Sequence, residues 1–121
     1  MTLYYALWLV GRVLFGGYFL YNAYGHFKNL EGMTGYAASK GVPNPKLAII
    51  GSGVLLVLGG LSVLLNYQVM YGLWALVIFL VPVTLMMHAF WKESDPVVKA
   101  GAKIQFSKNM AILGACFLLM Y

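Results

Sequence analysis

Residues 45–91 read PKLAIIGSGVLLVLGGLSVLLNYQVMYGLWALVIFLVPVTLMMHAFW, and this stretch decides the fold. It contains two apolar runs, 45–65 and 69–91, which are separated by only three residues. A hydrocarbon layer of about 30 Å requires about 20 apolar residues of helix to cross it. Each run therefore predicts a transmembrane helix, and the short link predicts that the two helices are antiparallel neighbours.

Two further apolar runs, about 3–25 and 104–121, flank this pair. Asp95 followed by Pro96 is a typical helix start, so the fourth helix is expected to begin before its apolar part. Between the first two runs, Leu30, Met33 and Ala37 recur at helical spacing and Gly41 follows as a C-cap. The sequence thus predicts an all-α, integral membrane four-helix bundle with a short interfacial helix, formed by residues 1–121 as a single domain.

The composition agrees with a membrane location. Hydrophobic residues make up 62% of the 121 residues and charged residues only 9%. A soluble domain is about half apolar and about a quarter charged. The excess of apolar side chains is expected to face lipid.

The net charge of +5 does not indicate a nucleic-acid partner, because the lysines lie in short segments between the apolar runs. There they would meet anionic lipid headgroups. All of them fall on one side of the predicted bundle: Lys28, Lys40, Lys46, Lys92, Lys99, Lys103 and Lys108. By the positive-inside rule this side is cytoplasmic, which predicts a multi-pass protein of the plasma or inner membrane with both termini outside.

Arg12 comes nine residues into the first run, near the middle of the predicted bilayer. A charge at that depth costs several kcal/mol unless it faces the bundle. We expect a structural role, in which the donors of the guanidinium tie together carbonyls or polar side chains of neighbouring helices.

Polar residues from three predicted helices fall at a similar depth near the lysine side. They are His26 with Asn22 nearby, His88, and Lys108 with Asn109. Individually, Lys108 is also explained by snorkelling, His26 by an interfacial position and His88 by a bond to a backbone carbonyl. Their convergence predicts a ligand-binding site, with Trp91 among the aromatic side chains beside it. The sequence identifies no catalytic residue and predicts no metal site.

Several short motifs are spread along the chain. They are GRVLFGG at 11–17, KGVPNP at 40–45, the pair Gly59-Gly60, His88 with Phe90-Trp91, and Lys108-Asn109. In this order and spacing, they resemble the DoxX family over essentially the whole chain. The resemblance implies a four-helix membrane protein. The family takes its name from a subunit of an archaeal thiosulfate:quinone oxidoreductase, and other members are linked to membrane redox complexes or to sulfur and thiol stress. A more distant eukaryotic branch resembles cargo receptors.

Three functions are compatible with these features. The first is a quinone-associated subunit of an oxidoreductase or of a redox or sulfur-stress complex, with His88 and Lys108 bonded to a quinone carbonyl. The second is an adaptor without chemistry, which binds a partner protein or a second copy through the lysine-rich face. The third is a transporter, which ranks last because the predicted spans contain no Asp or Glu as a proton carrier.

A quinone is therefore the expected cofactor. Haem is not expected, because the chain has only two histidines and His26 is predicted near the water boundary. The single Cys116 can form no intramolecular disulfide.

Overall fold

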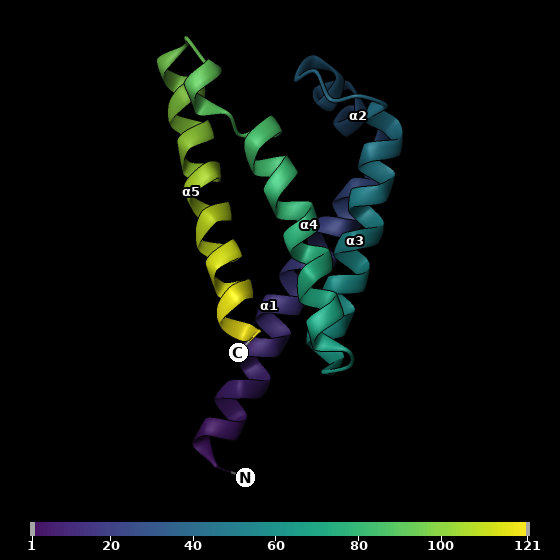
Figure 1. Ribbon diagram of the computed structural model, residues 1–121, viewed down its shortest axis with the longest axis vertical. Coiled ribbons are helices and arrows are strands. Elements are labelled where there is room, and N and C mark those ends of the chain that lie inside the picture. The colour runs from purple at the N-terminus through teal and green to yellow at the C-terminus, as the bar shows by residue number, and fades with distance from the viewer. Residues whose placement is uncertain (1, 121) are drawn as a thin grey trace.

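The computed structural model describes residues 2–120, which form helices joined by short connections (Figure 1). The elements are α1 (Leu3–Lys28), α2 (Leu30–Ser39), α3 (Pro45–Leu65), α4 (Val69–Met87), the 3₁₀ turn η1 (Phe90–Lys92) and α5 (Pro96–Leu119). No strand occurs among residues 2–120, so the predicted all-α class is confirmed.

Three helical segments are long and apolar enough to cross a membrane: Leu3–Lys28, Pro45–Leu65 and Val69–Lys92. Helix α5 is not among them, although it has 24 residues. Lys108 and Asn109 interrupt the apolar sequence of α5 and lower its mean hydropathy. The length and apolar composition of the helices therefore support three of the four predicted spans, and the fourth stays a prediction.

Helix α1 is displaced along its axis relative to the others. Figure 1 shows its N-terminal turns extending beyond the α3–α4 connection, at the end of the molecule where the C-terminus also lies. Helix α2 and the connection from α4 to α5 lie at the opposite end. Helix α3 packs against α1, α2 and α4, whereas α5 packs mainly on α4 and η1.

Glycines lie at the close contacts of α3 with α1 and of α3 with α4. A Cβ atom on Gly16 of α1 would lie 2.7 Å from the carbonyl oxygen of Gly60 and 2.9 Å from the amide nitrogen of Leu64, both on α3. On the other side of α3, a Cβ on Gly59 would collide with Leu76 of α4. Helices in lipid associate through such small residues because the backbones can then approach closely.

The core lies between α1, α3 and α4 and reaches one residue of α5. Its largest fully buried side chains are Phe19, Leu56, Leu73, Leu76, Leu80 and Cys116. Large apolar side chains also cover the outside, as Leu14 (68% exposed), Leu58 (56%) and Ile78 (57%) illustrate. An outer surface of this kind requires lipid as its solvent, because water would penalise it.

The starts of α5 and α3 differ in how they are capped. The carboxylate of Asp95 accepts hydrogen bonds from the backbone amides of Val97 and Val98 at 2.8 and 3.4 Å, so this N-cap is confirmed. Asn44 precedes α3 in a left-handed conformation, and its side chain makes no capping bond. Gly41 follows α2 with φ +78°, a conformation that glycine adopts without strain.

The connection between α3 and α4 is closed by a side chain. The Ser62 hydroxyl lies 2.6 Å from the carbonyl oxygen of Tyr67 and 2.9 Å from that of Gln68. Asn66 and Gln68 both adopt positive φ, which turns the chain within three residues. The antiparallel hairpin expected from the sequence is therefore formed, and its turn carries no charged residue.

The predicted third span, 69–91, agrees with the apolar helical segment Val69–Lys92, but this segment is not one continuous helix, because α4 ends at Met87. The chain leaves the helix at His88 and Ala89 and forms η1 instead. This change of direction packs the rings of Phe90 and Trp91 edge-on against Phe106 of α5, at centroid distances of 5.3 and 5.8 Å. Aromatic packing onto α5 thus accompanies the end of the helix.

Candidate ligand-binding site

A cavity of about 260 Å³ lies between α1, α4 and α5, toward the end that carries α2. Its amide, imidazole and ammonium groups come from three places in the chain: Asn22 and His26 on α1, His88 after α4, and Gln105, Lys108 and Asn109 on α5. Ser52 of α3 and Tyr36 of α2 also line it. Apolar side chains such as Phe19, Phe79 and Leu80 complete the wall. Four of the predicted ligand-binding residues, His26, His88, Lys108 and Asn109, therefore line one cavity.

His26 is held rigidly in the wall. It is only 7% exposed, and its Nδ1 lies 2.8 Å from the backbone carbonyl oxygen of Asn22, one turn earlier in α1. A carbonyl can only accept, so Nδ1 carries the proton and Nε2 of the neutral ring keeps its lone pair. Phe79 packs edge-on against the ring at 5.9 Å. The interfacial position considered for His26 is therefore not what the structure shows.

His88 stands where α4 ends. It is the C-cap residue of the helix, with φ −117°, and is half-buried. Its ring makes no hydrogen bond to another residue among residues 2–120. A bond to a backbone carbonyl, considered as an architectural role, is thus not formed, and the ring is available to a ligand in the cavity.

Helix α5 contributes two adjacent polar residues with different surroundings. Asn109 is 6% exposed and lines the cavity. The Lys108 ammonium is more exposed and lies 5.6 Å from the ring centroid of Tyr18 on α1, so it reaches across the cavity toward that helix. The amide of Asn109 and the ammonium of Lys108 thus line the same cavity as the two imidazole rings.

Trp91 does not join this group. It is 51% exposed, lies outside the lining of the cavity and packs on Phe90 and Phe106 instead. The rings that do line the cavity are Tyr18, Phe19, Tyr36 and Phe79. Sequence reasoning missed Tyr18, although it precedes Asn22 and His26 at intervals of four and therefore shares their face of α1.

An ion pair closes the lysine-bearing end next to the cavity. The Lys40 ammonium, in the connection after α2, donates a hydrogen bond to the Glu93 carboxylate, in the connection before α5. This hydrogen bond raises the pKa of Lys40 above its ordinary value. The pair joins two connections that are far apart in the sequence.

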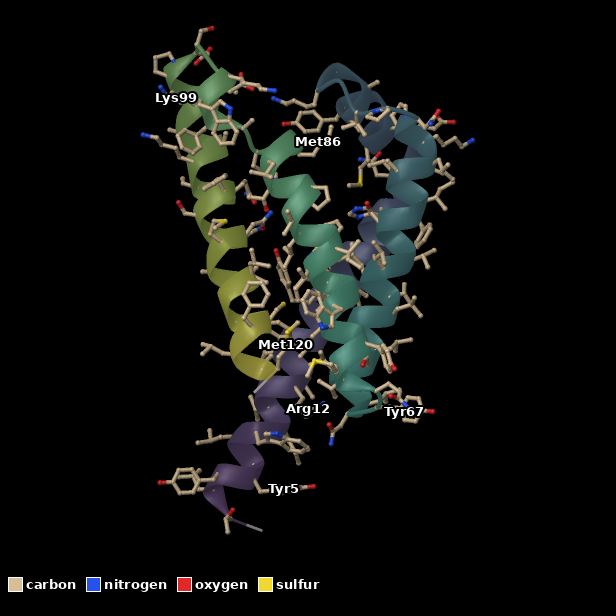
Figure 2. The ribbon with its side chains drawn as sticks, in the orientation of Figure 1. Tyr5, Arg12, Tyr67, Met86, Lys99 and Met120 are labelled. Carbon is tan, nitrogen blue, oxygen red and sulfur yellow. The ribbon has the colours of Figure 1, made fainter. Side chains whose placement is uncertain are left out.

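Arg12 lies at the other end of the molecule. Figure 2 shows it level with Tyr67 in the α3–α4 connection, because α1 is displaced along its axis. Its Nε and Nη2 atoms are buried and have no hydrogen-bond partner within residues 2–120. The expectation that Arg12 lies midway along the bundle and ties carbonyls together is therefore not what the structure shows. Its guanidinium instead stacks on Trp8 at 4.6 Å.

The fold and the cavity together define an all-helical membrane protein with a mostly apolar cavity into which α1, the end of α4 and α5 bring a few polar groups. The family model for DoxX matches residues 7–89, which is more than half of the chain. The chain belongs to the DoxX family, and the resemblance noted in the sequence is confirmed. The match includes His26 and His88 and ends before α5, so Lys108 and Asn109 lie outside it. No curated protein and no solved structure is similar enough to the chain to match it.

Proposed function

We propose that this DoxX-family protein is a quinone-associated membrane subunit of a redox or sulfur-stress complex, and that the cavity between α1, α4 and α5 binds the quinone head. The observation that carries the proposal is the convergence of His26, His88, Lys108 and Asn109 on this one cavity. Ligand sites are mostly apolar with a few polar groups that fix orientation, and this cavity has that character.

The donors fit the chemistry of a quinone. Its two carbonyl oxygens accept hydrogen bonds. The N–H groups of the Lys108 ammonium and of the Asn109 amide are donors that can bind such acceptors. The ring of His88 is free to donate or to accept, and His26 presents Nε2 because Nδ1 is bonded to Asn22. Phe19 and Phe79 offer apolar faces to a flat ring. A bound quinone would supply electron transfer to and from the lipid pool.

The direct test is to purify the protein in a mild detergent and to measure extractable quinone by its absorbance change on reduction. We expect retention close to one quinone per chain. His88→Ala and Lys108→Ala should lower retention about tenfold, which corresponds to a loss of about 1.4 kcal/mol. Lys103→Ala is the matched control, because Lys103 is also on α5 but lies over Phe90 outside the cavity.

Two outcomes would overturn the quinone proposal. One is a protein that retains no quinone and binds no short-chain analogue added to it. The other is a stoichiometric Soret band abolished by His88→Ala, since bis-histidine ligation of haem would then be the use of the two imidazoles. We expect no Soret band.

The adaptor function is favoured by a separate observation. The lysine-bearing connections gather at one end of the molecule, as Figure 1 shows for the α2 region and the α4–α5 connection. Exposed Lys99 and Lys103 on α5 would meet an acidic partner protein or a second copy there. Copurification of a partner that is lost in Lys99→Glu, from a protein without quinone, would establish this function instead.

We further propose that α5 crosses the bilayer as a fourth span, in a plasma or inner membrane, with the lysine-bearing end in the cytoplasm and α2 in the interface. A helix of 24 residues is about 36 Å long, enough for the hydrocarbon layer. Its Gln105, Lys108 and Asn109 line the cavity, and Asn109 is buried there. Cysteines at Lys40 and Lys99 should be protected from an impermeant thiol reagent in intact cells, and one at Tyr67 should react. Labelling of the first two would reverse the orientation.

A further inference from the structure

A second cavity, of about 370 Å³, lies at the end of the molecule opposite the lysines. Its walls come from all four long helices: Trp8, Arg12 and Phe15 of α1, Val63 of α3, Val69 of α4 and Leu118 of α5. Arg12 is the one charged residue in this lining. The cavity shares no lining residue with the proposed quinone site.

Within residues 2–120, the guanidinium in this cavity has no counter-charge. Nε and Nη2 of Arg12 are buried without a hydrogen-bond partner within residues 2–120. The acidic residues of the chain are Glu31, Glu93 and Asp95. Asp95 caps the start of α5, whereas Leu118 in the cavity lies at its end, about 35 Å further along the helix. The other two lie at the α2 end, so no acidic side chain of the chain reaches Arg12.

A buried guanidinium without partners is costly, and a bound anion removes that cost. Arginine matches phosphate with paired N–H groups in a planar fork. The remaining walls are apolar, which suits an acyl chain and would repel a small hydrated ion. Trp8, stacked on the guanidinium at 4.6 Å, is a residue type enriched at the headgroup level of membranes.

We propose that this cavity binds the phosphate of an anionic phospholipid, with Arg12 as the headgroup ligand and the acyl chains against the ends of α3, α4 and α5. The lipid supplies a negative charge that the described residues do not offer at this position. It also fills the space between α1 and the C-terminal turns of α5.

The test is native mass spectrometry of detergent-purified, delipidated protein titrated with phosphatidylglycerol or with phosphatidylcholine. Wild-type protein should retain one phosphatidylglycerol and bind phosphatidylcholine at least about tenfold more weakly. Arg12→Gln should lower the phosphatidylglycerol affinity about tenfold, and Arg12→Lys should lose less because it keeps the charge. Lys99→Gln removes one charge at the far end and should bind as the wild type does.

A second variant and a second ligand keep the proposal falsifiable. Ala115→Phe adds a ring at the wall of the cavity and keeps Arg12, so it should also lose the lipid even if Arg12→Gln folds poorly. Inorganic phosphate alone, at millimolar concentration, should not displace the lipid. Saturation by inorganic phosphate without a lipid adduct would identify a free-anion site, and equal lipid binding by wild type and Arg12→Gln would exclude Arg12 as the ligand; either result overturns the proposal.

Discussion

Six of the 21 residues of α3 are buried, whereas α5, with 24 residues, buries only Asn109 and Cys116. Helix α3 touches α1 and α4 through glycines, with backbone against side chain or backbone. Helix α5 has Gly101 and Gly114, and a Cβ on either would meet nothing within 4 Å. Both proposed ligand cavities lie where α5 stands away from the other helices. The comparison teaches that the α1–α3–α4 unit is the scaffold and that α5 provides one wall of each site.

The largest effect should come from closing the contact between α1 and α3. Gly16→Val places a side chain against the backbone of Gly60 and Leu64, which cannot give way, and should cost about 3 kcal/mol or prevent folding. Gly17→Val is the matched control, because nothing lies within 4 Å of its Cβ. Yield and thermal unfolding in detergent measure both. Equal behaviour of the two variants would refute the glycine contact.

Truncation of a core side chain tests the same difference between the α1–α3–α4 unit and α5, with a smaller expected effect. Leu76→Ala should destabilise by about 2 kcal/mol, because Leu76 is fully buried between α3 and α4 and leaves a cavity. Leu118→Ala on α5 should cost less than about 0.5 kcal/mol, since Leu118 is 80% exposed. Thermal unfolding of both variants in the same detergent provides the comparison. A larger loss from Leu118→Ala would place α5 inside the scaffold.

The third prediction concerns an amide in the wall of the cavity. Asn109→Leu removes an amide that lines the cavity, so it should abolish quinone retention while changing stability by about 1 kcal/mol or less. Asn22→Leu also loses the hydrogen bond from the Asn22 amide to the carbonyl of Tyr18 at 2.9 Å, so its stability should fall further. Stability and quinone content are measured on the same preparations. A strongly destabilised Asn109→Leu would show that the Asn109 amide has a structural role.

The smallest effect concerns the Lys40–Glu93 pair, which joins the scaffold side to the α5 side. A double-mutant cycle with Lys40→Met and Glu93→Gln should give a coupling of about 0.5 kcal/mol, as for other exposed pairs.

The same pair fixes a pH dependence. The raised pKa of Lys40 means that its contribution is complete below the ordinary value of 10.5 and is lost as the pH rises through the folded-state pKa. Thermal scans between about pH 8 and 11, the range toward which lysine titrates, should show the wild type losing its advantage over Lys40→Met only at the alkaline end. A loss that begins near neutral pH would assign the effect to another group.

The sequence was sufficient for the helices and for part of the site. Apolar run length located α1, α3 and α4. Residue depth brought His26, His88, Lys108 and Asn109 together, because His26 and His88 lie at the ends of α1 and α4, and Lys108 and Asn109 meet them from the middle of α5. The sequence did not predict the axial displacement of α1 or the end of α4 at His88. Arg12 was placed by counting from the start of a run, which assumes that all helices begin at one level, and α1 does not. Trp91 was placed by extending α4 through His88, where the helix ends.

The Ser62 turn between α3 and α4 has a consequence for how the chain enters a membrane. The connections on either side of the hairpin carry lysines, whereas this one contains Asn66, Tyr67 and Gln68 and no charge. The Ser62 hydroxyl also lies within hydrogen-bond distance of the carbonyl oxygens of Tyr67 and Gln68. Fewer polar groups of the turn therefore lose a hydrogen-bond partner when the turn leaves water for the bilayer. Translocation of this turn is therefore cheaper than that of either neighbouring connection, and α3 and α4 can enter the bilayer together as one hairpin, before α5 is in place.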